Sequence, residues 1–146
     1  MLARAGRLEL LRAAGERVVV PGTVAEEVTA HSDEAARALE SVEWLEVTPG
    51  VQLSTAVAAW DLGPGESAVL SWAAEHPGAV SVLDDYAART CAKALGLPLL
   101  GTLGLALRAK VNGEVNTARP VVEELVRAGL YLSDSVIREA LSLVGE

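Results

Sequence analysis

Apolar and polar residues alternate along this chain with two different periods, one typical of helices and one typical of short strands. Helical spacing predicts helices over 2–14, 24–30, 33–41, 64–75, 85–95, 102–111, 119–128 and 133–143, and we interpret 51–60 as helix as well. Short β-branched or apolar runs predict four strands, at 17–20, 44–47, 80–83 and 99–100. Because strands and helices alternate, the sequence predicts an α/β fold, a parallel sheet flanked by helices in three layers.

Carboxylates occupy two junctions of this pattern between residues 63 and 102. At 100° per residue, Glu66 shares a stripe with Leu70 and Ala73, which places it on the helix face predicted to be buried. Asp84 and Asp85 follow the apolar strand 80–83, and the carboxyl ends of strands are where ligands bind in α/β sheets. The spacing predicts that acids from separate elements come together.

Each of these acids also has an ordinary structural role open to it. Asp84 can cap the helix that follows it, and Glu66 can complement the dipole of its own helix. On the helix 24–30, Glu26 points away from the apolar edge and is interpreted as a surface charge, whereas Glu27 lies beside that edge. Taken together, the acids predict a site for Mg²⁺ or Mn²⁺, which prefer hard oxygen ligands.

The other chemically active side chains give weaker signals. His31 and His76 have no partner at a useful spacing and are predicted to be surface residues, and Cys91 is predicted to lie in the core. Thr102 follows a strand and is interpreted first as a helix cap and second as a polar group near the acids. No phosphate-loop fingerprint is present.

Composition and charge narrow the class of protein. The chain has 146 residues and a net charge of −8, which argues against a general electrostatic nucleic-acid binder. Hydrophobic residues make up 51% of it, enough for the core of one domain. No apolar run is long enough to span a membrane, and residues 1–9 do not read as a signal peptide, so a cytoplasmic protein without membrane contact is expected.

Several motifs, in order, resemble the PIN-domain family, in particular a subfamily of uncharacterised prokaryotic proteins. The motifs are Gly65-Glu66-Ser67-Ala68, then Val82-Leu83-Asp84-Asp85 with Ala88-Arg89, then Leu95-Gly96-Leu97-Pro98 and Gly101-Thr102-Leu103-Gly104. The similarity extends to Gly6-Arg7-Leu8-Glu9, to Val24-Ala25-Glu26-Glu27-Val28 and to Arg119-Pro120, and so covers nearly the whole chain. The resemblance implies one PIN-like domain over 1–146.

PIN domains are metal-dependent ribonucleases, often the toxin of a toxin–antitoxin pair. The resemblance implies that Glu27, Glu66 and Asp84 bind Mg²⁺ or Mn²⁺, with Asp85 as a further ligand or as the group that positions water. It implies a phosphate contact at Arg89 and a substrate contact at Thr102. The implied partners are single-stranded RNA, an antitoxin protein and a second copy of the chain.

One departure from the family pattern changes the expectation. The family begins with a central strand that carries a metal-binding Asp, and neither precedes the helix that contains Met1. Relative to the family the chain is therefore expected to be truncated at its N-terminus, with two groups of strands left unpaired. A late start codon, a shortened gene and a gap filled by another chain all explain this.

Two function classes follow from that departure. The first is a PIN-type endoribonuclease, with weak metal binding and little activity expected for residues 1–146 alone. The second is a non-catalytic PIN-like interaction module. A receiver-like phosphoacceptor built on Asp84 and Asp85 is disfavoured, because no further acceptor Asp or Lys stands at the end of another strand.

Overall fold

The computed structural model describes residues 1–31 and 33–146 and divides the chain into two compact units. Unit 1 consists of Met1–Glu16 together with Thr102–Glu146, and unit 2 is the continuous stretch Arg17–Gly101. We describe each unit by itself. The prediction of a single domain over 1–146 stays a prediction.

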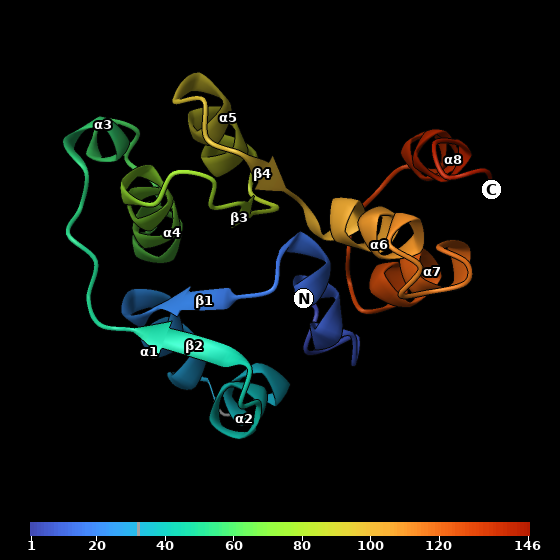
Figure 1. Cartoon of the computed structure of the whole chain (residues 1–146), viewed down its shortest axis with the longest axis horizontal. Coiled ribbons are helices and arrows are strands. Elements are labelled where there is room, and N and C mark those ends of the chain that lie inside the picture. Colours follow the sequence, from blue (N-terminus) through green and yellow to red (C-terminus); the bar gives the residue numbers. More distant parts are fainter. Residues whose placement is uncertain (32) are drawn as a thin grey trace. The chain divides into compact units, whose positions relative to one another are not determined.

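Unit 2 contains strands alternating with helices, labelled in Figure 1. In chain order they are β1 (Val18–Pro21), α1 (Gly22–Thr29), α2 (Glu34–Ser41), β2 (Leu45–Thr48), α3 (Thr55–Ala58), α4 (Pro64–Glu75), β3 (Ser81–Val82), α5 (Tyr86–Ala94) and β4 (Leu99–Leu100). Strand β1 pairs with β2 and β3 pairs with β4, both parallel. The predicted α/β class with parallel strands is confirmed.

The strands of the described residues form two separate two-stranded sheets. In the first sheet Val18 lies opposite Leu45, and the register continues to Pro21 opposite Thr48. Strand β1 ends at Pro21, because proline has no N–H to donate to a sheet. The division into two pairs agrees with the expectation of two strand groups that do not pair with each other.

Helix α4 is the element around which unit 2 is packed (Figure 1). It contacts α1, β1, α3, β3 and α5. Pro64 starts it in the position where a missing N–H costs nothing, and the helix ends at Glu75, before Pro77 and Gly78. Leu70 of α4 is fully buried in a core with Val57, Leu83 and Cys91.

The regular elements of unit 1, in the part that the structure describes, are all helices. Its elements are the 3₁₀ helix η1 (Leu8–Ala14) and the α-helices α6 (Thr102–Val111), α7 (Arg119–Arg127) and α8 (Asp134–Ser142). Helix α6 packs against both η1 and α7. Leu10 of η1, Leu105 of α6 and Leu125 of α7 are buried, so apolar side chains hold these elements together.

Charged side chains add two clamps to unit 1. Arg7 Nε donates to Glu124 Oε2 of α7 at 2.5 Å. The Glu146 carboxylate accepts the backbone N–H groups of Ala118 and Arg119 at 2.7 and 3.0 Å, where α7 begins, and lies 3.5 Å from Lys110 Nζ. These bonds hold the pKa values of the Glu124 and Glu146 carboxyl groups below their usual range. For Glu124 the main cause is the bond from Arg7, and for Glu146 it is the two backbone N–H groups.

Several predicted elements differ from the observed ones. The segment predicted as a helix over 2–14 is helical only from Leu8, because Gly6 has φ +66° and interrupts the preceding turns. The helix predicted over 51–60 is reduced to α3, four residues long. Helix α1 starts at Gly22, two residues before the predicted start at Val24. The segment between the predicted helices 24–30 and 33–41 includes Ser32, which lies outside the described residues.

No helix within residues 1–31 and 33–146 has the length and apolar character needed to cross a membrane.

Candidate functional site

Two of the predicted site residues meet at the first turn of α4, and we call Glu27 and Glu66 the glutamate pair. Helix α1 packs on α4, and Glu27 Oε1 accepts the backbone N–H of Gly65 at 2.9 Å. This N–H belongs to the first helical turn, where no intrahelical acceptor exists, so Glu27 satisfies it from a separate helix. Glu66 is the next residue of the same turn. A hydrogen bond between residues 38 positions apart in the sequence therefore brings Glu27 to the helix end that carries Glu66.

A second set of predicted residues lies where β3 and β4 end, and we call Asp84, Asp85 and Arg89 the strand-end group. The two strands are parallel, and Leu83 N donates to Leu100 O at 2.9 Å, so pairing continues to the residue before Asp84. Asp85 Oδ1 accepts the N–H of Ala88 at 2.9 Å. The capping role considered for Asp84 therefore belongs to Asp85, which is the N-cap of α5.

Arg89 is held beside Asp84 by the backbone around it. Its Nη1 donates to the carbonyl oxygen of Leu83 at 3.0 Å, and its side chain is half-buried. Both Arg89 Nη1 and Asp84 Oδ1 lie next to Gly101: a Cβ built there would be 2.6 Å from the first and 3.1 Å from the second. The predicted phosphate contact and one predicted metal ligand therefore border the same glycine.

Thr102 belongs to a different unit from these acids. It is the first residue of α6, it belongs to unit 1, and it is only 2% exposed. Its predicted role as a substrate contact stays a prediction. Its burial shows that the hydroxyl group is not at the surface in this conformation.

The acids are more exposed than the helical stripe predicted. Glu66 is half-buried, and Glu27, Asp84 and Asp85 are exposed. Leu70 and Ala73 on the same stripe are buried as predicted. The difference has a simple cause: Glu66 lies in the first turn, at the edge of the core, where an ionised carboxylate keeps water around it.

The fit of these residues to a divalent metal ion is partial. Their donor atoms are carboxylate oxygens, the type that Mg²⁺ and Mn²⁺ prefer. Yet within the described part of the chain no three or more Asp, Glu, His or Cys side chains are grouped so that they could hold an ion. The glutamate pair and the strand-end group are two local arrangements, and the backbone N–H groups of Gly65 and Ala88 already use one oxygen each of Glu27 and Asp85.

Sequence reasoning missed the glycines that border these acids. It gave Gly63 no role and named Gly65 only within the family motif, whereas the structure sets them against the carboxylates of Glu66 and Glu27. The available signal was a glycine directly before an acid, as in Gly65-Glu66. The partner Glu27 could not be found this way, because it is distant in sequence.

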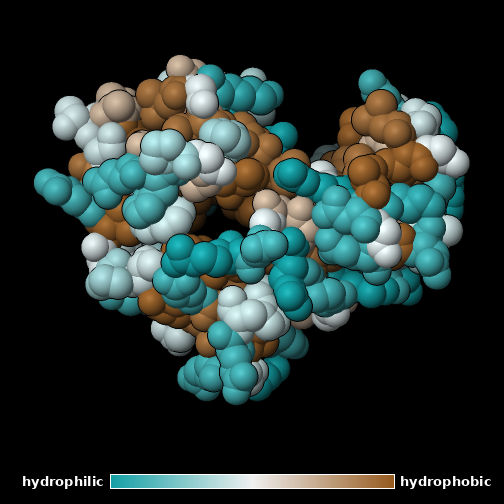
Figure 2. Space-filling model, viewed as in Figure 1, coloured by the Kyte–Doolittle hydropathy of each residue, from teal (hydrophilic) through white to brown (hydrophobic). Residues whose placement is uncertain are grey.

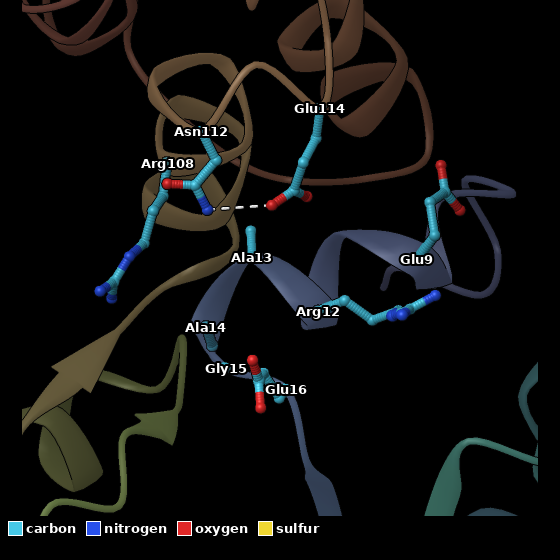
Figure 3. A pocket seen from close by; sticks show the side chains of 9 residues that line it. All are labelled: Glu9, Arg12, Ala13, Ala14, Gly15, Glu16, Arg108, Asn112 and Glu114. Carbon is cyan, nitrogen blue, oxygen red and sulfur yellow. Dashed lines mark hydrogen bonds between the residues drawn. The ribbon is translucent and has the colours of Figure 1, made fainter.

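Two cavities of unit 1 contain none of the predicted site residues. One, of about 780 Å³, lies beside η1 and the end of α6, where Asn112 Nδ2 donates to Glu114 Oε1 (Figure 3). The other, of about 340 Å³, lies between α7 and α8 and is bordered by Val122, Val126 and Ile137. Hydrophobic residues are gathered over α8 in Figure 2. Neither cavity brings together acids at a metal-binding spacing.

The remaining side chains singled out in the sequence have structural roles. Cys91 is fully buried, as predicted, and burial raises the pKa of its thiol. His31 and His76 are exposed, as predicted, and the His76 ring stacks on Trp72 with centroids 3.8 Å apart. None of them lies with the acids in a metal-holding group of the described residues.

Comparison with protein families identifies the fold. A family model described as a PIN domain matches residues 1–146. The chain belongs to the PIN-domain family. No curated protein and no solved structure matches it. As a PIN domain it is a nuclease-type module, which gives the glutamate pair and the strand-end group a chemical context.

Proposed function

We propose that this PIN domain is a metal-dependent endoribonuclease. The observation that carries the proposal is the meeting of Glu27 and Glu66, from different helices, at the first turn of α4. Both acids match positions of the family resemblance. The N-terminus of a helix favours negative charge, so two carboxylates can gather there at a lower cost than elsewhere on the surface.

The proposed roles are those that the family resemblance implies for these residues. Glu27, Glu66 and Asp84 would hold Mg²⁺ or Mn²⁺, and Asp85 would be either a further ligand or the group that orients water. When bound, the ion supplies Lewis-acid polarisation of a phosphodiester. Arg89, anchored by the Leu83 carbonyl, binds a phosphate oxygen of single-stranded RNA.

The proposal extends to the cellular role. In it, the protein is the toxin of a toxin–antitoxin pair, acts in the cytoplasm, and binds an antitoxin protein and a second copy of itself. The support is the likeness of its motifs to such PIN proteins. The net charge of −8 suits a basic partner segment.

The test is cleavage of a labelled single-stranded RNA by protein in excess, with Mn²⁺, with Mg²⁺ and with a chelator. The parent is expected to cleave slowly and only with metal. Glu66→Gln should reduce cleavage to background, because it removes a charged oxygen ligand. Glu26→Gln is the matched control, since Glu26 is exposed on the same helix that carries Glu27. Cleavage that survives chelation, or that is equal in all three proteins, would contradict the proposal.

The second candidate function is a non-catalytic interaction module with a PIN-like body. It is favoured by the absence of a metal-holding group of three or more side chains among the described residues. A parent protein that neither binds Mn²⁺ nor cleaves RNA, yet forms a stable complex with an antitoxin-like partner, would select this function.

A further inference from the structure

Three glycines of unit 2 are set against the predicted site side chains. A Cβ on Gly65 would clash with the Oε2 atom of Glu27 and lie 3.2 Å from its carboxyl carbon. A Cβ on Gly63 would clash in the same way with the Oε2 atom of Glu66. At Gly101 the clash is with Arg89, whose Nη1 atom would be 2.6 Å away. In each case the space left by a missing side chain holds the end of a predicted site residue.

This arrangement differs from the ordinary uses of glycine elsewhere in the chain. Gly78 and Gly96 have φ of +89° and +67°, so their backbone conformation explains them, and an added Cβ would meet nothing. A Cβ added to Gly22 would lie 2.9 Å from the backbone oxygen of Thr48, so close packing of the backbone requires glycine there. Gly65 lies inside a helix, where alanine is the better residue. The presence of glycine at position 65 therefore needs another reason.

We propose that Gly65 and Gly101 are positioning residues, whose missing side chains set where the Glu27 carboxylate and the Arg89 guanidinium lie. Gly63 acts in the same way on Glu66. The inference rests on the proposed function for its purpose, because these are the side chains assigned to metal and phosphate. The geometry itself does not depend on that assignment.

The clashing atoms make a specific prediction about stability. At both positions the added methyl group meets the far end of a flexible side chain, which can swing away without moving the backbone. Gly65→Ala also favours the helix. The folded state should therefore persist, while Glu27 leaves its place and the N–H of residue 65 loses its acceptor.

The experiment compares the parent with Gly65→Ala, Gly101→Ala and the control Gly50→Ala. Gly50 is matched because an added Cβ meets nothing within 4 Å and its φ is not left-handed. The first readout is metal-free: the temperature coefficient of the residue 65 amide proton in NMR, which reports its hydrogen bond. The second is Mn²⁺ affinity from electron paramagnetic resonance. The third is thermal unfolding.

We expect Gly65→Ala to remove the hydrogen-bond signature of residue 65 and to weaken Mn²⁺ binding roughly tenfold or more, the cost of disturbing residues that orient metal ligands. Gly101→Ala should weaken Mn²⁺ binding and displace the Arg89 guanidinium signal. The unfolding midpoint should stay close to that of Gly50→Ala. In a Glu27→Gln background, Gly65→Ala should add little, because the two changes act on one group.

A failure of the positioning role can be distinguished from a failure of the proposed function. If the residue 65 amide and the Mn²⁺ affinity of Gly65→Ala equal those of Gly50→Ala, the positioning role is wrong. If the parent binds no Mn²⁺, the proposed metal-dependent function is wrong, and the amide signal of residue 65 still decides whether Gly65 places Glu27.

Discussion

Units 1 and 2 differ in what surrounds their carboxylates. In unit 1, Glu124 receives a bond from Arg7, and Glu146 lies near Lys110 and caps the start of α7. In unit 2, Glu27 and Asp85 accept backbone N–H groups, and Glu27 and Glu66 lie in the space left by glycines. The first arrangement ties helices together. The second holds charged oxygens in place at helix ends, where Glu27 and Asp85 stay exposed and Glu66 is half-buried.

The way in which a carboxylate is held therefore indicates whether it is available for a functional role. A carboxylate whose pKa is lowered by a salt bridge or by capping already contributes to stability, and removing it should be costly. A carboxylate held by one N–H beside a glycine contributes less to stability, and its second oxygen stays available to bind a ligand.

The largest effect should come from the core, and it should be confined to one unit. Leu70→Ala removes a fully buried side chain from α4 and should destabilise unit 2 by about 2–5 kcal/mol. Amide hydrogen exchange by mass spectrometry should show faster exchange in residues 17–101. Leu125→Ala in α7 is the matched change in unit 1. Equal acceleration in both units from either change would show that they unfold together.

Acid should weaken unit 1 first. Because the folded-state pKa values of Glu124 and Glu146 are lowered, their contribution to stability is present above the ordinary value of about 4.5. It is lost as pH falls through the lower folded-state values. The unfolding midpoint of unit 1 should therefore fall between pH 6 and pH 3.

Glu146→Gln should lower the midpoint of unit 1 at pH 6 and flatten this pH dependence. Glu139→Gln, an exposed position of α8, is the control and should leave both unchanged. A pH dependence that is the same in the parent and in Glu146→Gln would show that this clamp does not stabilise unit 1.

A moderate effect should come from metal, and only in unit 2. At a Mn²⁺ concentration ten times the dissociation constant, mass action stabilises the folded site by about 1.4 kcal/mol. Thermal unfolding with millimolar Mn²⁺ should show this shift in the parent and in Glu26→Gln, and largely lose it in Glu66→Gln. An equal shift in all three proteins would place the ion elsewhere.

The smallest effect should come from the exposed ion pair of unit 2. Arg17 and Glu46 approach to 2.7 Å, but their side chains are 73% and 51% exposed. Water screens such a pair, so Arg17→Ala should cost about 0.2–1 kcal/mol in chemical denaturation. Arg7, in the ion pair of unit 1 with Glu124, has a side chain that is 32% exposed. If Arg17→Ala cost more stability than Arg7→Ala, the ion pair of unit 1 would not be the more stabilising of the two.

The sequence predicted the elements best where local chemistry marks their ends. Helix α4 begins at Pro64 and α6 ends before Asn112-Gly113, and both helices run over the predicted residues. Prediction failed where the outcome depends on distant partners. Strand β3 is observed at Ser81–Val82, shorter than the predicted 80–83, whereas β4 has the predicted bounds Leu99–Leu100. The length of β3 depends on its pairing with β4, which no local pattern determines.

The site was predictable as a set of acids but not as an arrangement. The family motif marks Glu27, Glu66, Asp84 and Asp85, and their metal-binding role stays a prediction. What sequence could not supply is the bond from Gly65 to Glu27, because it depends on how α1 packs against α4. It also assigned the cap of α5 to Asp84, since two adjacent aspartates fit that position equally well.

The way the chain threads through the two units has a consequence for synthesis on the ribosome. Residues 17–101 form unit 2 in one uninterrupted stretch, but η1 must wait for α6 before it has a surface to pack on. Joining them closes a loop of that whole length, an entropic cost on the order of 4 kcal/mol that a folded unit 2 would reduce. A nascent chain halted near Gly101 would therefore present unit 2, with its glutamate pair and strand-end group, attached to an unfolded leading segment.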